Sequence, residues 1–138
     1  NLLKRSNSDY AIDIEIIGDP ESEKDFYVRG NKSLLTSAMM NIMDNCCKYS
    51  SNKYVDVKMI LKNKMILLEM SDDGPGISPE DVQLIFKPFY RDPRNYHKKG
   101  FGIGLSLVNT VMKIHQFKLE VASKEDKGSV FKIYIPNS

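Results

Sequence analysis

Two asparagines and a lysine share one face of a predicted helix in the middle of the chain. They are Asn41, Asn45 and Lys48, and they lie in an otherwise apolar run. Side chains at i, i+4 and i+7 of a helix lie above one another, so these three form a polar edge beside an apolar arc. An amide oxygen can bind Mg²⁺ when a nucleotide supplies phosphate oxygens. A lone asparagine more often bonds across a core edge, however, and a lysine at a helix end more often complements the helix dipole.

A carboxylate follows the second strand of a predicted hairpin, in the stretch Asp72-Asp73-Gly74-Pro75-Gly76-Ile77. Held at a strand end, Asp72 could accept a hydrogen bond from an exocyclic amine such as that of adenine. The glycines would let a ligand approach the backbone closely. Asp-Gly turns are also common for structural reasons alone, and for this motif in isolation that interpretation is the better one.

A glycine cluster, Gly100-Phe101-Gly102-Ile103-Gly104, precedes the last predicted helix. The free amides and the positive dipole end of a helix favour a phosphate there. Arg91, Lys98 and Lys99 add positive charge in the preceding loop. The spacing is neither the dinucleotide fingerprint nor the phosphate-loop pattern, so alone it is a weak signal. His97 and His115 have no partner at ligand or triad spacing, and neither is assigned a catalytic role.

Composition points to one ordinary folded domain over residues 1–138. The 138 residues are 41% hydrophobic, and 20 basic against 18 acidic residues give a net charge of +2 without a basic block. This balance argues against a nucleic-acid-binding or membrane-anchoring surface. No apolar run approaches the ~20 residues of a membrane span. Because the chain begins with Asn1, we expect a fragment of a longer protein. Cys46 and Cys47 lack disulfide or metal spacing and are predicted to be small buried hydrophobes.

Hydrophobic periodicity predicts the elements that position these residues. Strands are expected at 10–17, 26–28, 54–61, 65–71, 117–123 and 129–135. Helices are expected at 32–49, 78–86 and 105–115, and 87–102 is expected to be a mobile loop. In the first strand Ile12, Ile14 and Ile16 alternate with Asp13 and Glu15, which predicts a half-buried strand. The strand at 65–70 is the most continuously apolar, so we expect it to be central.

The motifs together are far more specific than any one of them. Asn-x-x-x-Asn-x-x-Lys-Tyr, Asp-x-Gly-x-Gly-Ile, Phe-x-x-Phe-Tyr-Arg and Gly-x-Gly-x-Gly-Leu occur in this order. They resemble the N, G1, F and G2 boxes of the ATP-binding domain of sensor histidine kinases, in the GHKL superfamily. The resemblance covers about residues 26–135. It implies an α+β fold of the Bergerat type: a two-layer sandwich with a mixed five-stranded sheet under three helices, and ATP between the helices and a lid.

The resemblance implies a role for each motif. Asn45 would hold Mg²⁺, with Asn41 beside it near the phosphates; Lys48 would reach phosphate and Tyr49 would flank the adenine. Asp72 would accept the adenine amino hydrogen, with Gly74, Gly76 and Ile77 in the nucleotide site.

Phe86 and Phe89 would anchor the lid, and Arg91 would approach the terminal phosphate, with Lys99 also in the site. Gly100, Gly102 and Gly104 would let the lid close, with the amides near Leu105 facing phosphate. Gln116 and Phe117 depart from the small or glycine pair usual after the last helix, which puts that local turn in doubt.

Asn41 separates two kinds of chemistry within this fold. The related ATPases carry Glu at this position, and an amide cannot act as a general base. The resemblance therefore implies a histidine kinase domain, using ATP and Mg²⁺, with Asn41 and Arg91 as its catalytic residues. A water-activating ATPase and a degenerate interaction module without nucleotide are the alternatives. No phosphoacceptor motif is present, so we expect the fragment not to phosphorylate itself.

The implied partners lie outside this sequence. They are a helical phosphoacceptor dimerisation domain of the same parent and a downstream response regulator. We expect no nucleic-acid partner, a monomeric fragment, a homodimeric parent, and a cytoplasmic location with any inner-membrane anchor outside the fragment.

Overall fold

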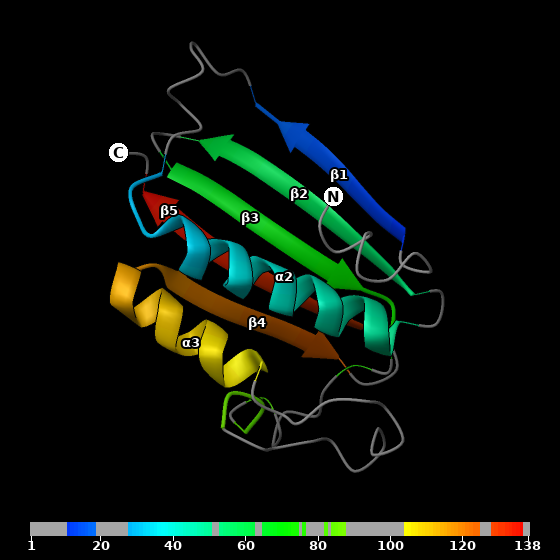
Figure 1. The fold of residues 1–138 in the computed structure, drawn as a ribbon. Helices are drawn as coiled ribbons and strands as arrows, with labels where there is room; N and C mark the ends of the chain where they lie inside the picture. Colours follow the sequence, from blue (N-terminus) through cyan, green and yellow to red (C-terminus); the bar gives the residue numbers. More distant parts are fainter. Residues whose placement is uncertain are drawn as a thin grey trace.

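One sheet and two helices make up the described part of the computed structural model, which comprises residues 11–18, 28–50, 53–62, 65–74, 76, 82, 84–87, 104–124 and 128–136. The strands are β1 (Ala11–Ile17), β2 (Tyr54–Lys62), β3 (Met65–Asp72), β4 (Lys118–Lys124) and β5 (Gly128–Pro136), and the helices are α2 (Lys32–Tyr49) and α3 (Gly104–His115). Figure 1 shows both helices on the same face of the sheet. This two-layer α+β arrangement confirms the predicted fold class.

The sheet is mixed, as predicted, with strand order β1-β2-β3-β5-β4. β1 pairs with β2 in parallel, and the other neighbours are antiparallel. β3 is the central strand, as its continuous apolar run predicts, and pairs with β2 on one side and with β5 on the other. Its pairing with β5 ends at Asp72 opposite Ser129. The candidate carboxylate therefore lies at the end of the central strand.

The core fills the space between α2, α3 and the sheet. Its fully enclosed side chains include Ala38, Ile42 and Cys46 of α2, and Phe131 of β5. Burial of such apolar surface stabilises the domain by about 25 cal/mol per Å². The apolar arc of α2 follows the predicted helical period, so Asn41 and Asn45 are left half-buried beside it.

The ends of α2 agree with the predicted span of 32–49. The Asn31 side chain accepts a hydrogen bond from the Leu34 N–H at 3.0 Å, and the Ser50 N–H donates to the Cys46 carbonyl. An N-cap side chain of this kind is worth about 1 kcal/mol. The start of α3 lies beside Asn41, while His115 at its end accepts a hydrogen bond from the Asn31 N–H at 3.0 Å. The two helices therefore run antiparallel and are joined at two levels.

The turn after α3 has a regular geometry despite its unusual sequence. Gln116 has a φ of 59°, the Gln116 N–H donates to the Lys113 carbonyl, and the Phe117 N–H donates to the Met112 carbonyl. This is the Schellman motif, in which a left-handed residue closes the helix. A glutamine here pays a steric penalty that a glycine would avoid.

Three predicted elements differ from the described structure or are described only in part. The half-buried character of the first strand is wrong for Ile14 and Ile16, whose side chains are 56% and 57% exposed. They lie opposite Val57 and Met59 on the helix-covered side of the sheet, but α2 packs on β2 and β3 and does not extend over β1. Of the predicted 78–86 helix, only 82 and 84–86 are described, and these form turns. Of the predicted 26–28 strand only Val28 is described, and it is not in a strand.

Candidate functional site

A backbone donor holds the carboxylate of Asp72 at the end of β3. The Gly74 N–H donates to its Oδ1 at 2.8 Å. Burial raises the pKa of Asp72 above its ordinary value, while the hydrogen bond from Gly74 opposes that rise. Asp72 is thus a half-buried acceptor of fixed orientation, which is the requirement for selective recognition of an amine.

The hairpin between β4 and β5 approaches the Asp72 turn at backbone distance. Gly128 has a φ of 92°, and a Cβ there would lie 2.0 Å from the Asp72 carbonyl oxygen. Only glycine fits this position. Gly128 lies between the predicted strands 117–123 and 129–135 and belongs to none of the motifs that predict the site. The missed signal was a glycine beginning an apolar strand, which often marks the close approach of another backbone.

A side-chain hydrogen bond connects α2 to the Asp72 turn. Ser50, at the end of α2, donates to Asp73 Oδ1 at 2.6 Å, and Ser50 is buried. Ser50 directly follows the predicted helix 32–49 and belongs to none of the motifs that predict the site. Through Ser50, α2 is joined to Asp73, the acidic residue that directly follows β3. The position of Asp72 therefore depends on α2 as well as on the sheet.

Asn41 lies against the first residue of α3. A Cβ built on Gly104 would be 2.9 Å from Asn41 Oδ1. The Asn41 amide nitrogen donates to the Ser37 carbonyl at 2.8 Å, which leaves Oδ1 directed toward the start of α3. A helix start carries partial positive charge, and this one has no acidic residue in its first turn. The structure thus brings together the N and G2 motifs, which are separated by almost half the sequence.

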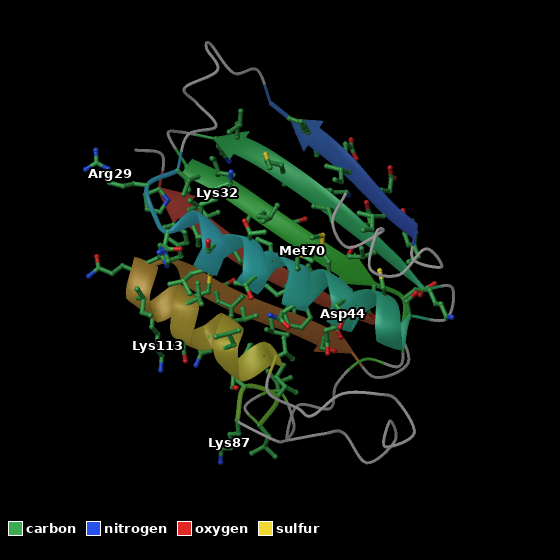
Figure 2. All side chains as sticks on the ribbon, viewed as in Figure 1. Arg29, Lys32, Asp44, Met70, Lys87 and Lys113 are labelled. Atoms are coloured by element: carbon green, nitrogen blue, oxygen red, sulfur yellow. The ribbon has the colours of Figure 1, made fainter. Side chains whose placement is uncertain are left out.

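A groove of about 770 Å³ runs along one side of α2, and Asn41 forms part of its wall. Its other lining residues are Lys32, Ser33, Thr36, Ser37, Met40 and Asp44. Figure 2 shows Lys32 and Asp44 near opposite ends of the helix. Asp72 is not among the lining residues, so the groove marks the Asn41 side of the region and the carboxylate lies beyond it.

The predicted site residues fall into three groups. Those with described surroundings are Asn41, Asn45, Asp72, Gly74, Gly76, Gly104 and Leu105. For Lys48 and Tyr49 the structure confirms only the helical backbone. The predictions for Ile77, Phe89, Arg91, Lys99, Gly100 and Gly102 lie outside the described residues. Gly76 has a φ of 74°, which favours glycine at this turn.

The two adjacent cysteines are free and buried, as expected. Burial raises the pKa of Cys47 to about 11, with smaller contributions from the charges of Asp44 and Asp72. Burial also raises the pKa of Cys46 well above its ordinary value, followed by the effect of Asp72. Both thiols are therefore protonated at neutral pH.

Within the described residues, no cluster of three His, Cys, Asp or Glu side chains could hold a metal ion. A Mg²⁺ site built from one amide and nucleotide oxygens needs no such cluster. No helix in the described part of the chain is long and apolar enough to span a membrane.

Sequence comparisons give a consistent result. Residues 30–138 match the family model described as histidine kinase-, DNA gyrase B- and HSP90-like ATPase. The chain is 36% identical over 109 residues to the sensor histidine kinase CpxA of Escherichia coli strain K12, covering 78% of this chain and 24% of CpxA. It is 31% identical over 134 residues to the signal transduction histidine-protein kinase ArlS of Staphylococcus aureus strain USA300, covering 95% of this chain and 29% of ArlS. The chain thus spans about a quarter of the length of the curated relatives it matches.

Solved structures of similar fold agree with the sequence relatives. The mycobacterial sensor histidine kinase MprB superposes with a TM-score of 0.79 at 27% identity, covering 98% of this chain and 87% of MprB. The catalytic domain of histidine kinase ThkA superposes with a TM-score of 0.74 over 99% of this chain and 86% of ThkA. At 21% identity the latter comparison shows the shared fold alone.

Proposed function

The chain belongs to the family of histidine kinase-, DNA gyrase B- and HSP90-like ATPases, and on that premise we propose that it binds Mg-ATP and donates the γ-phosphate to a histidine on a separate helical domain. The family membership supports ATP binding. The observation that carries the assignment to this region is the half-buried carboxylate of Asp72 at the end of β3, which the Gly74 N–H holds by a hydrogen bond of 2.8 Å. An ionised, oriented carboxylate accepts a hydrogen bond from the adenine amino group and rejects a base that lacks this donor.

The phosphate end of the nucleotide is assigned to the other half of α2. Asn41 and the start of α3 meet there, and the helix N-terminus favours negative charge. Asn45, on the same face of α2, is one turn closer to Asp72 and supplies an amide oxygen for Mg²⁺. When bound, Mg²⁺ neutralises phosphate charge and so assists displacement at the γ-phosphorus. Asn41 contributes alignment, because its amide cannot take a proton from the nucleophile.

The lack of a general base at Asn41 favours transfer to a protein over hydrolysis by water. Phosphoryl transfer depends mainly on alignment and charge stabilisation, which a site of this composition can provide. A histidine brought by a helical dimerisation domain is then the acceptor. A response regulator would receive the phosphoryl group afterwards. We propose that this chemistry takes place in the cytoplasm. We also propose that the domain is monomeric on its own and that the longer parent protein is a homodimer. Arg91 is assigned to the terminal phosphate, and Lys48 and Lys99 are assigned to phosphate contacts.

Calorimetric titration with ATP, with and without Mg²⁺, tests the proposal. We expect the unmodified chain to bind ATP and Asp72→Asn to bind at least about tenfold more weakly, since an amide presents a donor where adenine also donates. The exposed Asp13→Asn on β1 is the matched control and should leave affinity unchanged. Equal ATP affinity of the Asp72→Asn variant and the unmodified chain would reject the assignment of Asp72.

A second assay, with a helical phosphoacceptor domain, should give transfer of phosphate to histidine and little free phosphate. Rapid release of phosphate in the absence of the acceptor would instead indicate an ATPase.

A further inference from the structure

His115 joins the end of α3 to the start of α2. Its Nε2 lies 3.0 Å from the backbone nitrogen of Asn31, and its Nδ1 lies 2.8 Å from the carbonyl oxygen of Val111. A backbone N–H can only donate, so Nε2 must carry the lone pair, and the proton on Nδ1 is then donated to the carbonyl. Both hydrogen bonds therefore require the neutral ring in one tautomer.

The start of α2 leaves room for this half-buried ring. A Cβ on Gly30 would lie 2.6 Å from His115 Cδ2 and 2.8 Å from Nε2, so the ring packs where a side chain is absent. The next residue, Asn31, is the N-cap of α2, and its side chain accepts a hydrogen bond from the Leu34 N–H at 3.0 Å. His115 is thus bonded to the residue that fixes where α2 begins.

This bond restricts the position of α3 along α2. The buried side chains of α3 are Val108, Val111 and Met112. Apolar packing of this kind is non-directional, and packed helices can slide past one another by small amounts. A hydrogen bond, in contrast, weakens steeply when its distance or angle changes. Because α3 is one helix of 12 residues, a bond at its last residue also restricts where its first residue, Gly104, lies against Asn41.

We propose that His115 is a positioning residue for the phosphate end of the nucleotide site: the neutral ring keeps the start of α3 against Asn41, and protonation of the ring releases α3 and weakens ATP binding. The inference rests on the proposed function, which assigns the start of α3 to phosphate. His115 itself does not contact the nucleotide. The effect cannot exceed the free energy of the bond, since its loss only lowers the population of the arrangement that binds ATP.

The surroundings of His115 explain why protonation would break the bond. The two described segments that meet at the ring, 28–35 and 111–118, carry four charged side chains, and all are cationic: Arg29, Lys32, Lys113 and Lys118. Figure 2 shows the first three toward the end of the molecule where α2 begins and α3 ends. Glu120, further along β4, is paired with Lys118 at 2.9 Å. Within these two segments no carboxylate can accept from an imidazolium, whose new N–H would point at the Asn31 N–H.

The test is calorimetric titration of the unmodified chain, His115→Ala and His115→Gln with ATP and Mg²⁺ from about pH 8 to about pH 5.5, the range in which an imidazole titrates. At the upper pH we expect His115→Ala to bind ATP about threefold to tenfold more weakly, the range that loss of one hydrogen bond produces. His115→Gln should stay within about twofold of the unmodified chain, because its amide oxygen can accept from the Asn31 N–H.

The pH profile separates positioning by the neutral ring from a general effect on packing. As pH falls, the affinity of the unmodified chain should approach that of His115→Ala, whereas the ratio between the two variants should stay constant. Comparing affinities at each pH cancels the titration of ATP and of the other groups in the site. If His115→Ala does not fold, the ratio of the unmodified chain to His115→Gln across the pH range decides the question.

Two further variants provide controls. Gly30→Ala retains the imidazole but places a Cβ against it, so ATP binding should weaken in the same direction as in His115→Ala. Ile114→Ala is the matched control, because Ile114 adjoins His115 on α3 and is 63% exposed. Its ATP affinity should follow that of the unmodified chain at every pH.

Two different failures can be told apart. If His115→Ala binds ATP as tightly as the unmodified chain, or if the affinities of the unmodified chain and the two His115 variants keep a constant ratio at every pH, the role of His115 is overturned and the proposed function stands. Urea unfolding would then show whether the bond stabilises the fold alone. If the unmodified chain does not bind ATP at any pH, the proposed function fails and the inference fails with it.

Discussion

Asn41 and Gly104 lie so close that a single added carbon on the glycine would come within 2.9 Å of the asparagine Oδ1. This distance is shorter than van der Waals contact, so a side chain at Gly104 would require the Asn41 amide to move away from the start of α3. The two residues belong to motifs that the sequence separates widely. Their contact joins the polar face of α2 to the positive end of α3.

Gly104→Ala should therefore weaken ATP binding with little loss of stability. The Cβ displaces the Asn41 amide, at a cost of the order of 1–3 kcal/mol when overpacking is not relieved, which corresponds to about tenfold in affinity. Alanine has a better helix propensity than glycine, which offsets part of the effect on folding. Titration with ATP and a thermal melt measure the two effects. The control is Thr110→Ala, an exposed position on the same helix, which should change ATP affinity little. If Gly104→Ala bound ATP as tightly as the unmodified protein, the position of Asn41 would not matter for binding.

Gly128→Ala should destabilise the whole domain. A Cβ would lie 2.0 Å from the Asp72 carbonyl oxygen, and the φ of 92° is strained for alanine. Because the opposing atom belongs to the backbone of the central strand, it cannot move aside cheaply. We expect a loss of about 3 kcal/mol or more in the free energy of unfolding, measured with urea. The exposed Ala122→Ser in the paired strand β4 should be close to neutral, and wild-type stability in Gly128→Ala would contradict the close approach.

Gln116→Gly should stabilise the protein. Gln116 closes α3 with a φ of 59°, where a Cβ is unfavourable by about 1 kcal/mol. The greater flexibility of glycine in the unfolded chain reduces this gain. Urea unfolding of the glycine, asparagine and original proteins should rank stability in the order Gly, Asn, Gln. A glycine variant less stable than the original would show that the Gln116 side chain stabilises this turn.

The effect of Asp72 on stability should depend on pH. Burial raises the folded-state pKa of Asp72 above its unfolded value, so the folded state binds this proton more tightly. Its contribution to stability therefore falls as pH rises from the unfolded value of about 4 through the raised folded-state pKa. Asp72→Asn cannot titrate, so its stability relative to the unmodified protein should improve as pH increases over this window. Urea unfolding at several pH values from about 4 to 7 measures the difference; a trend in the opposite direction would mean that the hydrogen bonds to Asp72 outweigh its burial.

The local pattern of the sequence was enough to place most elements. The predicted helix 32–49 coincides with α2, because the signals that define this helix are local in the sequence. They are the helical period of its apolar residues, the N-cap residue Asn31 and Ser50 at its end. The central position of β3 followed from its continuous apolar character. Ile14 and Ile16 show where this reasoning fails, since alternation identifies the apolar side of a strand but not whether a helix reaches far enough to cover it.

The site shows the same division between sequence and tertiary structure. Motif order identified Asp72, Asn41 and the glycines as candidates, because residue type and spacing carry that information. The partners that hold them came only from the fold: the Ser50 hydroxyl on Asp73, the backbone of Gly128 against the Asp72 turn, and Gly104 against Asn41. Each of these contacts joins elements distant in the chain. No local propensity encodes such a contact, because its geometry is decided by how α2, α3 and the hairpin of β4 and β5 pack on one sheet.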